Sequence, residues 1–66
     1  MTLRNAQPPL GPIEIDSGNI IGLRKRNDGS TVILQSIEPT HIHVRDPFPL
    51  VCKFLYEELQ AKGGIR

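Results

Sequence analysis

Alternating hydrophobic and polar residues run through the middle of the chain and predict a β-hairpin. Residues 19–26 and 30–37 are rich in Ile, Leu and Val and are joined through Asn27-Asp28-Gly29. Asp-Gly is favoured in two-residue type I′ turns, because both central positions need a positive φ. We therefore expect two antiparallel strands connected at this turn.

The length of the connecting loop decides which side chains of the hairpin are buried. A loop of Asp28-Gly29 pairs Arg24 with Ile33 and turns one set of apolar side chains toward the core, namely Ile21, Leu23, Val32 and Leu34. The opposite, outward set is then Ile20, Ile33 and Ile37. A loop one residue longer or shorter reverses the faces of the second strand, because successive side chains point to opposite faces. Both registers leave apolar residues on both faces of the sheet.

The next run, residues 41–45, alternates in the same way and predicts a third strand. Ile42 and Val44 are expected to point to one face of the sheet. The other face receives His41, His43 and Arg45.

The N-terminal residues predict an arm outside the domain. Residues 1–12 contain Pro8, Pro9, Gly11 and Pro12, a density that excludes a helix, so we expect an extended or disordered segment. Residues 13–16 alternate and predict a short edge strand, followed by a turn at residues 16–19. We therefore expect the ordered domain to span residues 13–62 and residues 63–66 to form a flexible tail.

The segment after residue 45 predicts a helix. Asp46 is a favourable N-cap residue, and the helix is expected to run from residues 47–49 to Lys62, with Gly63-Gly64 as its stop. On a helical wheel the stripe expected to pack on the sheet comprises Val51, Cys52, Leu55, Tyr56 and Leu59. Leu50, Phe54 and Ala61 lie off this stripe. They either contact another chain, seat the N-terminal arm, or are singly exposed apolar residues of the ordinary kind.

These elements predict an α+β fold, a small three- or four-stranded antiparallel β-meander with one C-terminal helix packed on one face. The chain has 66 residues, a net charge of +1 and a single cysteine. A chain this short, without a disulfide or a metal framework, often gains stability by association, so we expect a homodimer. No apolar run reaches the roughly 18 residues that a membrane span requires. We therefore expect no membrane partner and a cytoplasmic location.

The outward face of the predicted sheet carries a local basic patch. The candidate partner-binding residues on it are Arg24, Arg26, Gln35, His41, His43 and Arg45. Guanidinium groups match both carboxylates and phosphates, so the patch suits an acidic protein surface or an RNA or DNA backbone. No aromatic residue lies on this face to stack a base, and the same charges also suit a solvated strand face that discourages edge aggregation. The candidate apolar interface comprises Ile33, Leu50 and Phe54.

The sequence contains no catalytic, metal or cofactor motif. His41 and His43 share a face at a spacing that suits a metal ion, but a zinc site needs three or four protein ligands and no third ligand is near in sequence. Cys52 lies on the core-facing stripe, where a free cysteine behaves as a small apolar residue. Glu57 and Glu58 are adjacent on the helix and point about 100° apart. We therefore expect no enzymatic activity, no metal and no cofactor.

One resemblance bears on the partner. Residues 29–39, followed by Ile42, Val44, Arg45 and then a helix, loosely resemble the carbon-storage-regulator family of small dimeric RNA binders. The proline-rich segment departs from that family where its first strands begin. The resemblance implies RNA as an alternative partner. Spare apolar surface without a catalytic site is typical of small domains that bind proteins, so we predict a regulator, inhibitor or assembly component, a class that includes proteins of phages and mobile elements.

Overall fold

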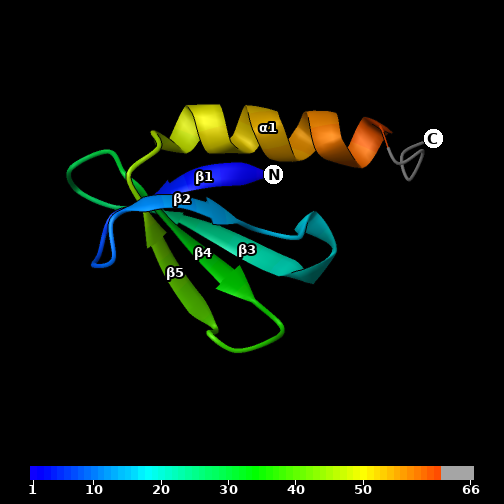
Figure 1. The fold of residues 1–66 in the computed structure, drawn as a ribbon. Coiled ribbons are helices and arrows are strands. Elements are labelled where there is room, and N and C mark those ends of the chain that lie inside the picture. Colours follow the sequence, from blue (N-terminus) through cyan, green and yellow to red (C-terminus); the bar gives the residue numbers. More distant parts are fainter. Residues whose placement is uncertain (62–66) are drawn as a thin grey trace.

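The computed structural model describes residues 1–61, which fold into a five-stranded antiparallel sheet with one helix across one face (Figure 1). The elements are β1 (Thr2–Asn5), β2 (Gly11–Glu14), the 3-10 helix η1 (Ser17–Asn19), β3 (Ile20–Lys25), β4 (Thr31–Gln35), β5 (His41–Val44) and α1 (Phe48–Ala61). The α+β class with a C-terminal helix is confirmed. The expected count of three or four strands is wrong, because the N-terminal residues add a hairpin to the predicted meander.

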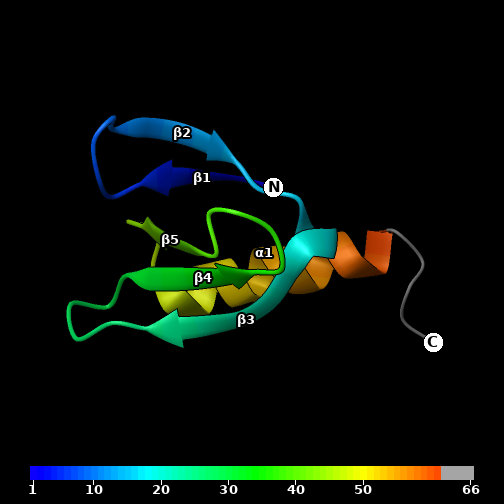
Figure 2. The same cartoon turned by 90° about the horizontal axis from the view of Figure 1, so that it is seen from below.

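The strand order β2-β1-β5-β4-β3 joins this hairpin to the meander along β1 and β5. The joint is short: Asn5 is paired with Val44, and backbone hydrogen bonds of 2.9 and 2.7 Å flank the pair. Figure 2 shows the consequence, with β2 and β3 at opposite edges of the sheet.

The N-terminal residues differ from the arm that we expected. β1 and β2 pair in the register Leu3↔Ile13, and Leu3 is only 1% exposed in the hydrophobic core. Pro8 and Pro9 lie in the loop between the strands, and Pro12 lies in an edge strand, where a missing backbone N–H is tolerated. The prolines therefore mark the turn and the edge of a hairpin, and the folded region begins before residue 13.

Beyond the ends of β3 and β4, Arg26 and Ser30 close the hairpin, so its loop contains three residues, 27–29, rather than the expected two. The amide of Arg26 donates to the carbonyl of Ser30 at 2.9 Å, and Gly29 has a positive φ of 88°. Three-residue hairpin loops commonly end in a residue with a left-handed backbone, which glycine adopts without strain. The carboxylate of Asp28 also accepts the amide hydrogen bond of Ser30 at 2.9 Å, which stabilises the longer loop.

The longer loop reverses the faces of β4 relative to our preferred register. Arg24 is paired with Val32 instead of Ile33. Ile33 is 0% exposed, so its predicted outward position is wrong and it contributes to the core rather than to an interface. Gln35, also predicted to point outward, is buried on the same side, and its side-chain amide donates to the carbonyl of Pro39 at 2.8 Å.

A bulge in β3 changes the faces of two further residues. The pairing register shifts between Ile20 and Gly22, which leaves Ile21 as the extra residue. Ile20 packs against the core although we expected it to point outward, and Ile21 is 71% exposed although we expected it to be buried.

The hydrophobic core lies between the sheet and α1. Its buried members are Leu3, Ile15, Ile33, Ile42, Val44 and Val51. The predicted alternation of the third strand of the meander is confirmed, since Ile42 and Val44 are buried and His41 is exposed.

The face that α1 turns to the sheet is rotated from the predicted stripe. Val51 is fully buried as expected, but Phe54, predicted to lie off the stripe, packs against the core, and Tyr56 is 55% exposed. Glu58 explains the rotation in part, because its carboxylate forms an ion pair of 2.9 Å with the α-amino group of Met1. A wheel of apolar positions does not show such a polar contact.

The helix begins at Phe48, close to the predicted start. Its first amide, that of Phe48, donates to the carbonyl of Gly29 in the β3–β4 loop at 3.1 Å. The carboxylate of Asp46, which we expected to cap the helix, instead accepts a hydrogen bond of 2.7 Å from the amide of Arg4 in β1. The predicted last residue, Lys62, and the tail after it lie outside the described residues.

Candidate functional site

The face of the sheet opposite α1, here called the open face, carries the candidate site. Antiparallel pairing aligns side chains of β3, β4 and β5 in rows that point to one side. One row is Gly22, Leu34 and His41, and the next is Arg24, Val32 and His43. Arg26 and Arg45 follow at the ends of β3 and β5.

The middle of the open face is apolar. Val32 and Leu34 are half-buried, and within residues 1–61 the helix lies across the opposite face of the sheet. Leu34 extends over Gly22: a Cβ atom at Gly22 would lie 3.3 Å from Cδ1 of Leu34. The exposed Ile21 adds an apolar residue at the β3 edge.

Basic side chains surround this apolar centre near the β3–β4 loop. A hollow of about 510 Å³ is lined by Arg24, Lys25, Arg26, Asn27, Asp28, Val32 and His41. All three cationic side chains on its wall are exposed, and Asp28 is the single acidic residue there. The arrangement suits a group that combines negative charge with apolar surface.

Ser30 connects the loop to β5 and forms a polar cluster beside this hollow. Its hydroxyl donates to the carboxylate of Asp28, and its Oγ lies 2.8 Å from Nε2 of His43. A hydroxyl has one proton, so with that proton on the Asp28 side we infer that Nε2 of His43 is the donor. The side-chain and backbone hydrogen bonds of Ser30 lower the pKa of Asp28, with smaller contributions from the charges of Arg26 and His43. Because the serine proton is directed to Asp28, the cluster lacks the hydroxyl-to-imidazole donation that activates a nucleophile. These hydrogen bonds connect the β3–β4 loop to β5.

The sequence-predicted residues separate into three groups in the structure: the open face with its margin, the buried side of the sheet, and α1. Arg24, Arg26 and His41 are exposed on the open face, with His43 half-buried beside them, and the exposed Arg45 lines a neighbouring hollow of about 540 Å³. Gln35 and Ile33 are buried on the opposite side, as described above. Sequence reasoning missed Val32 and Leu34 as site residues. Their signal was the alternative loop length, which exchanges the two faces of β4.

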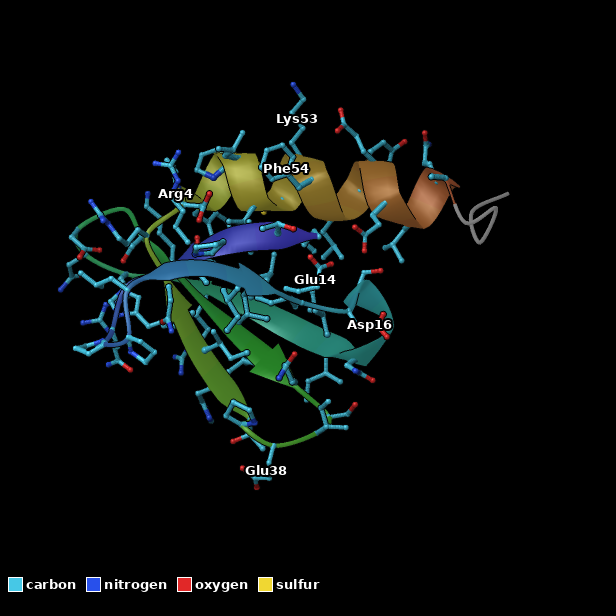
Figure 3. All side chains as sticks on the ribbon, viewed as in Figure 1. Arg4, Glu14, Asp16, Glu38, Lys53 and Phe54 are labelled. Atoms are coloured by element: carbon cyan, nitrogen blue, oxygen red, sulfur yellow. The ribbon has the colours of Figure 1, made fainter. Side chains whose placement is uncertain are left out.

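Leu50 and Phe54 lie elsewhere, on α1. Leu50 is 37% exposed, and both side chains line a separate hollow of about 510 Å³ between the β1–β2 hairpin and the start of the helix. Figure 3 shows Arg4 near this end of α1, whereas Lys53 points away from the sheet. Because Phe54 packs against the core, Leu50 offers the more accessible apolar surface of the pair.

Within residues 1–61, no three His, Cys, Asp or Glu side chains come together in a way that could hold a metal ion. Over the same range, no helix combines the length and apolar character needed to cross a membrane. Cys52 is half-buried on α1.

Comparisons of the chain with protein-family models, with curated proteins and with solved structures give no match.

Proposed function

We propose that this protein is a small non-enzymatic protein-binding module that uses the open face as its binding surface. It acts as a regulator, an inhibitor or an assembly component. The observation that carries the proposal is the combination of half-exposed Val32 and Leu34 with the exposed arginines Arg24 and Arg26 on the same face. Protein interfaces combine an apolar centre with a polar rim, and arginine is enriched among the residues that dominate their binding energy.

The competing function is RNA or DNA binding, which the same cations favour. Single-stranded nucleic acids are usually held by aromatic side chains that stack on the bases. The chain has three aromatic residues, Phe48, Phe54 and Tyr56, and all of them belong to α1 on the other side of the sheet. The open face therefore has charge for a phosphate backbone but no stacking platform, which favours the protein partner.

We further propose that the protein is a homodimer through α1 rather than through the open face. Leu50 is exposed beside the hollow at the start of the helix, and a contact there leaves the open face accessible. A two-fold contact of this kind needs only one self-complementary patch.

Capture from extracts of the source cell tests the main proposal. The immobilised protein is compared with Val32→Asp and Arg24→Ala, at low and high salt and with or without nuclease. Lys53→Ala is the matched control, because it removes an exposed cation that points away from the sheet. A protein that is retained after nuclease treatment, is lost with both open-face variants and is kept by Lys53→Ala supports the proposal. Binding that disappears with nuclease contradicts it and favours the nucleic-acid function.

A further inference from the structure

β3 is an edge strand: among residues 1–61, no strand pairs with its outer side. β3 is the last strand in the sheet order. The Arg26 amide donates to Ser30 at the loop end of the hairpin. Because hydrogen-bonded pairs alternate along an antiparallel ladder, Arg24 and Gly22 are the next residues whose N–H and C=O groups point toward β4. Those of Leu23 and Lys25 therefore point away from the sheet, in the direction of an added strand.

The opposite edge, β2, is less able to accept a strand. The amide of Ile15 donates to the carbonyl of Met1 at 2.8 Å, so the same alternation turns the backbone groups of Pro12 and Glu14 outward. Proline has no N–H, and a proline at this position blunts an edge strand. β3 contains no proline, so its outward positions keep both donors and acceptors.

We propose that an extended, acidic segment of a partner protein adds to the sheet as a sixth strand along β3. This inference rests on the proposed protein-binding function and names the chemistry of the partner. Strand addition supplies main-chain hydrogen bonds for affinity, whereas the alternating side chains provide specificity. The partner segment thus contacts both the β3 edge and the margin of the open face.

The positive charges along β3 favour an acidic segment of another protein over a second copy of β3. Arg24 and Lys25 occupy the strand and Arg26 follows it. Two copies paired through this edge would bring these like charges close together, which is destabilising across strands. An acidic segment neutralises the same charges, so the feature that discourages self-pairing favours this partner.

The side chains of β3 also define a register for the segment. Gly22 leaves space on the open face that Leu34 partly fills, so a residue beside Gly22 meets an apolar surface. Arg24 points to the same face two positions later, and Lys25 points to the opposite face. An antiparallel segment that fits this edge therefore has one acidic residue beside Lys25 and the next one beside Arg24. Two positions further along the segment, an apolar residue lies beside Gly22.

The probe is the acetylated, amidated peptide Thr-Glu-Glu-Thr-Val-Thr, which matches this register. Binding is followed by NMR on the labelled full-length protein. We expect the amide signals of Leu23 and Lys25 to shift and their hydrogen exchange to slow, with no such change at Glu14. Two control peptides, one with both glutamates replaced by lysine and one methylated on its backbone nitrogens, should not bind. Equal binding by either control overturns the proposal.

The matched protein variants are Lys25→Pro and Lys25→Ala. Both remove the charge, but only the proline also removes the outward N–H, so it should bind the peptide about tenfold more weakly than the alanine variant. Equal affinities overturn strand addition. If Lys25→Pro unfolds, the comparison of plain and methylated peptides on the wild-type protein decides the question.

The same variants separate this inference from the proposed function. If Lys25→Pro still captures the cellular partner that Val32→Asp loses, strand addition is wrong and the open-face function stands. If neither variant affects capture, the proposed function fails as well. Slowed exchange at Leu23 and Lys25 with an oligonucleotide but not with the peptide also overturns the proposal.

Discussion

The Oγ atom of Ser30 lies 2.8 Å from Nε2 of His43, so one buried hydroxyl ties the β3–β4 loop to the neighbouring strand β5. The same hydroxyl donates to Asp28. We expect Ser30→Ala to lower the urea midpoint and to raise the pKa of Asp28 toward its ordinary value, because its strongest stabilising hydrogen bond is lost. Carboxyl-detected NMR titration measures the pKa. Ser30→Thr keeps a hydroxyl and is the control; an unchanged pKa of Asp28 in the alanine variant contradicts the prediction.

Substitutions at adjacent positions of β4 test the observed register. Ile33 is fully buried, so Ile33→Ala should lose about 2–5 kcal/mol of unfolding free energy. Val32 is half-buried on the open face, and Val32→Ala should lose much less. Urea denaturation of both variants provides the measurement. If Val32→Ala lost more unfolding free energy than Ile33→Ala, the result would contradict the observed register and favour the two-residue loop.

The α-amino group of Met1 makes stability depend on pH. Burial alone lowers its pKa, but hydrogen bonds and charges of Glu58 and Glu14 raise it above the ordinary value of 8.0. Its contribution is therefore complete below about pH 8 and is lost as pH rises through the raised pKa. The hydrogen bond from Thr2, followed by that from the amine, lowers the pKa of Glu14 below 4.5, so that contribution is lost as pH falls through the lowered value.

Urea midpoints measured from acidic to alkaline pH should show a plateau between these limits. Glu58→Gln should weaken the alkaline decline, because it removes the partner 2.9 Å from the amine. Glu57→Gln, a neighbouring exposed carboxylate, is the control. Identical pH profiles for Glu58→Gln and the wild type would refute the role of this ion pair.

The exposed arginines should control the salt dependence of partner binding. Replacing Arg24, Arg26 and Arg45 together with alanine should weaken binding and flatten its dependence on ionic strength. All three side chains are exposed, so the thermal midpoint should change little. Titration of the captured partner at several salt concentrations gives the result. A triple variant that binds normally, or that unfolds, removes these arginines from the proposed surface.

Sedimentation of the wild type and Leu50→Asp tests the proposed dimer. The wild type should sediment as a dimer at micromolar concentration, and Leu50→Asp as a monomer, because the contact would bury an unpaired charge. Leu50 is the informative position, since Phe54 also packs against the core of its own chain. Lys53→Asp places the same charge on α1 away from the sheet and should remain dimeric. A monomeric wild type ends the hypothesis.

Local patterns predicted the elements of the meander and the helix, but not the contacts that orient them. The alternation of apolar and polar residues around Ile42 and Val44 predicted correctly that these two side chains are buried. This prediction needs only the local sequence, because successive side chains of a strand point to opposite faces. Whether Ile33 points to the core depended on the length of the loop before β4. A difference of one residue in that loop moves every side chain of the strand to the opposite face of the sheet. Asp-Gly is favoured in two-residue turns, whereas the structure has a three-residue loop beside which Ser30 contacts Asp28 and His43.

Long-range polar contacts account for the remaining differences. Asp46 carries a helix-capping signal, yet its carboxylate binds the amide of Arg4, far away in sequence. Likewise, prolines predicted an arm because their local effect is to prevent regular structure. The burial of Leu3 on the meander provides the tertiary stabilisation that a local pattern does not contain. The basic residues of the site were predicted from the sequence. Its apolar centre, Val32 and Leu34, was not, because the face of these residues depends on the β3–β4 register.

The hydrogen bond from the amide of Phe48 to the carbonyl of Gly29 attaches the β3–β4 loop to the first residue of α1. With Ser30 holding its other side, the loop is restrained by two different elements. The backbone that carries Arg26 is therefore already ordered in the free protein. Binding of a partner would cost little additional backbone conformational entropy at this loop. The remaining entropic cost of binding at this loop comes largely from side chains, and it amounts to about 0.5–1.5 kcal/mol of free energy for each side chain that is immobilised. In the proposed complex, a loop that is already ordered lowers the entropic cost of binding.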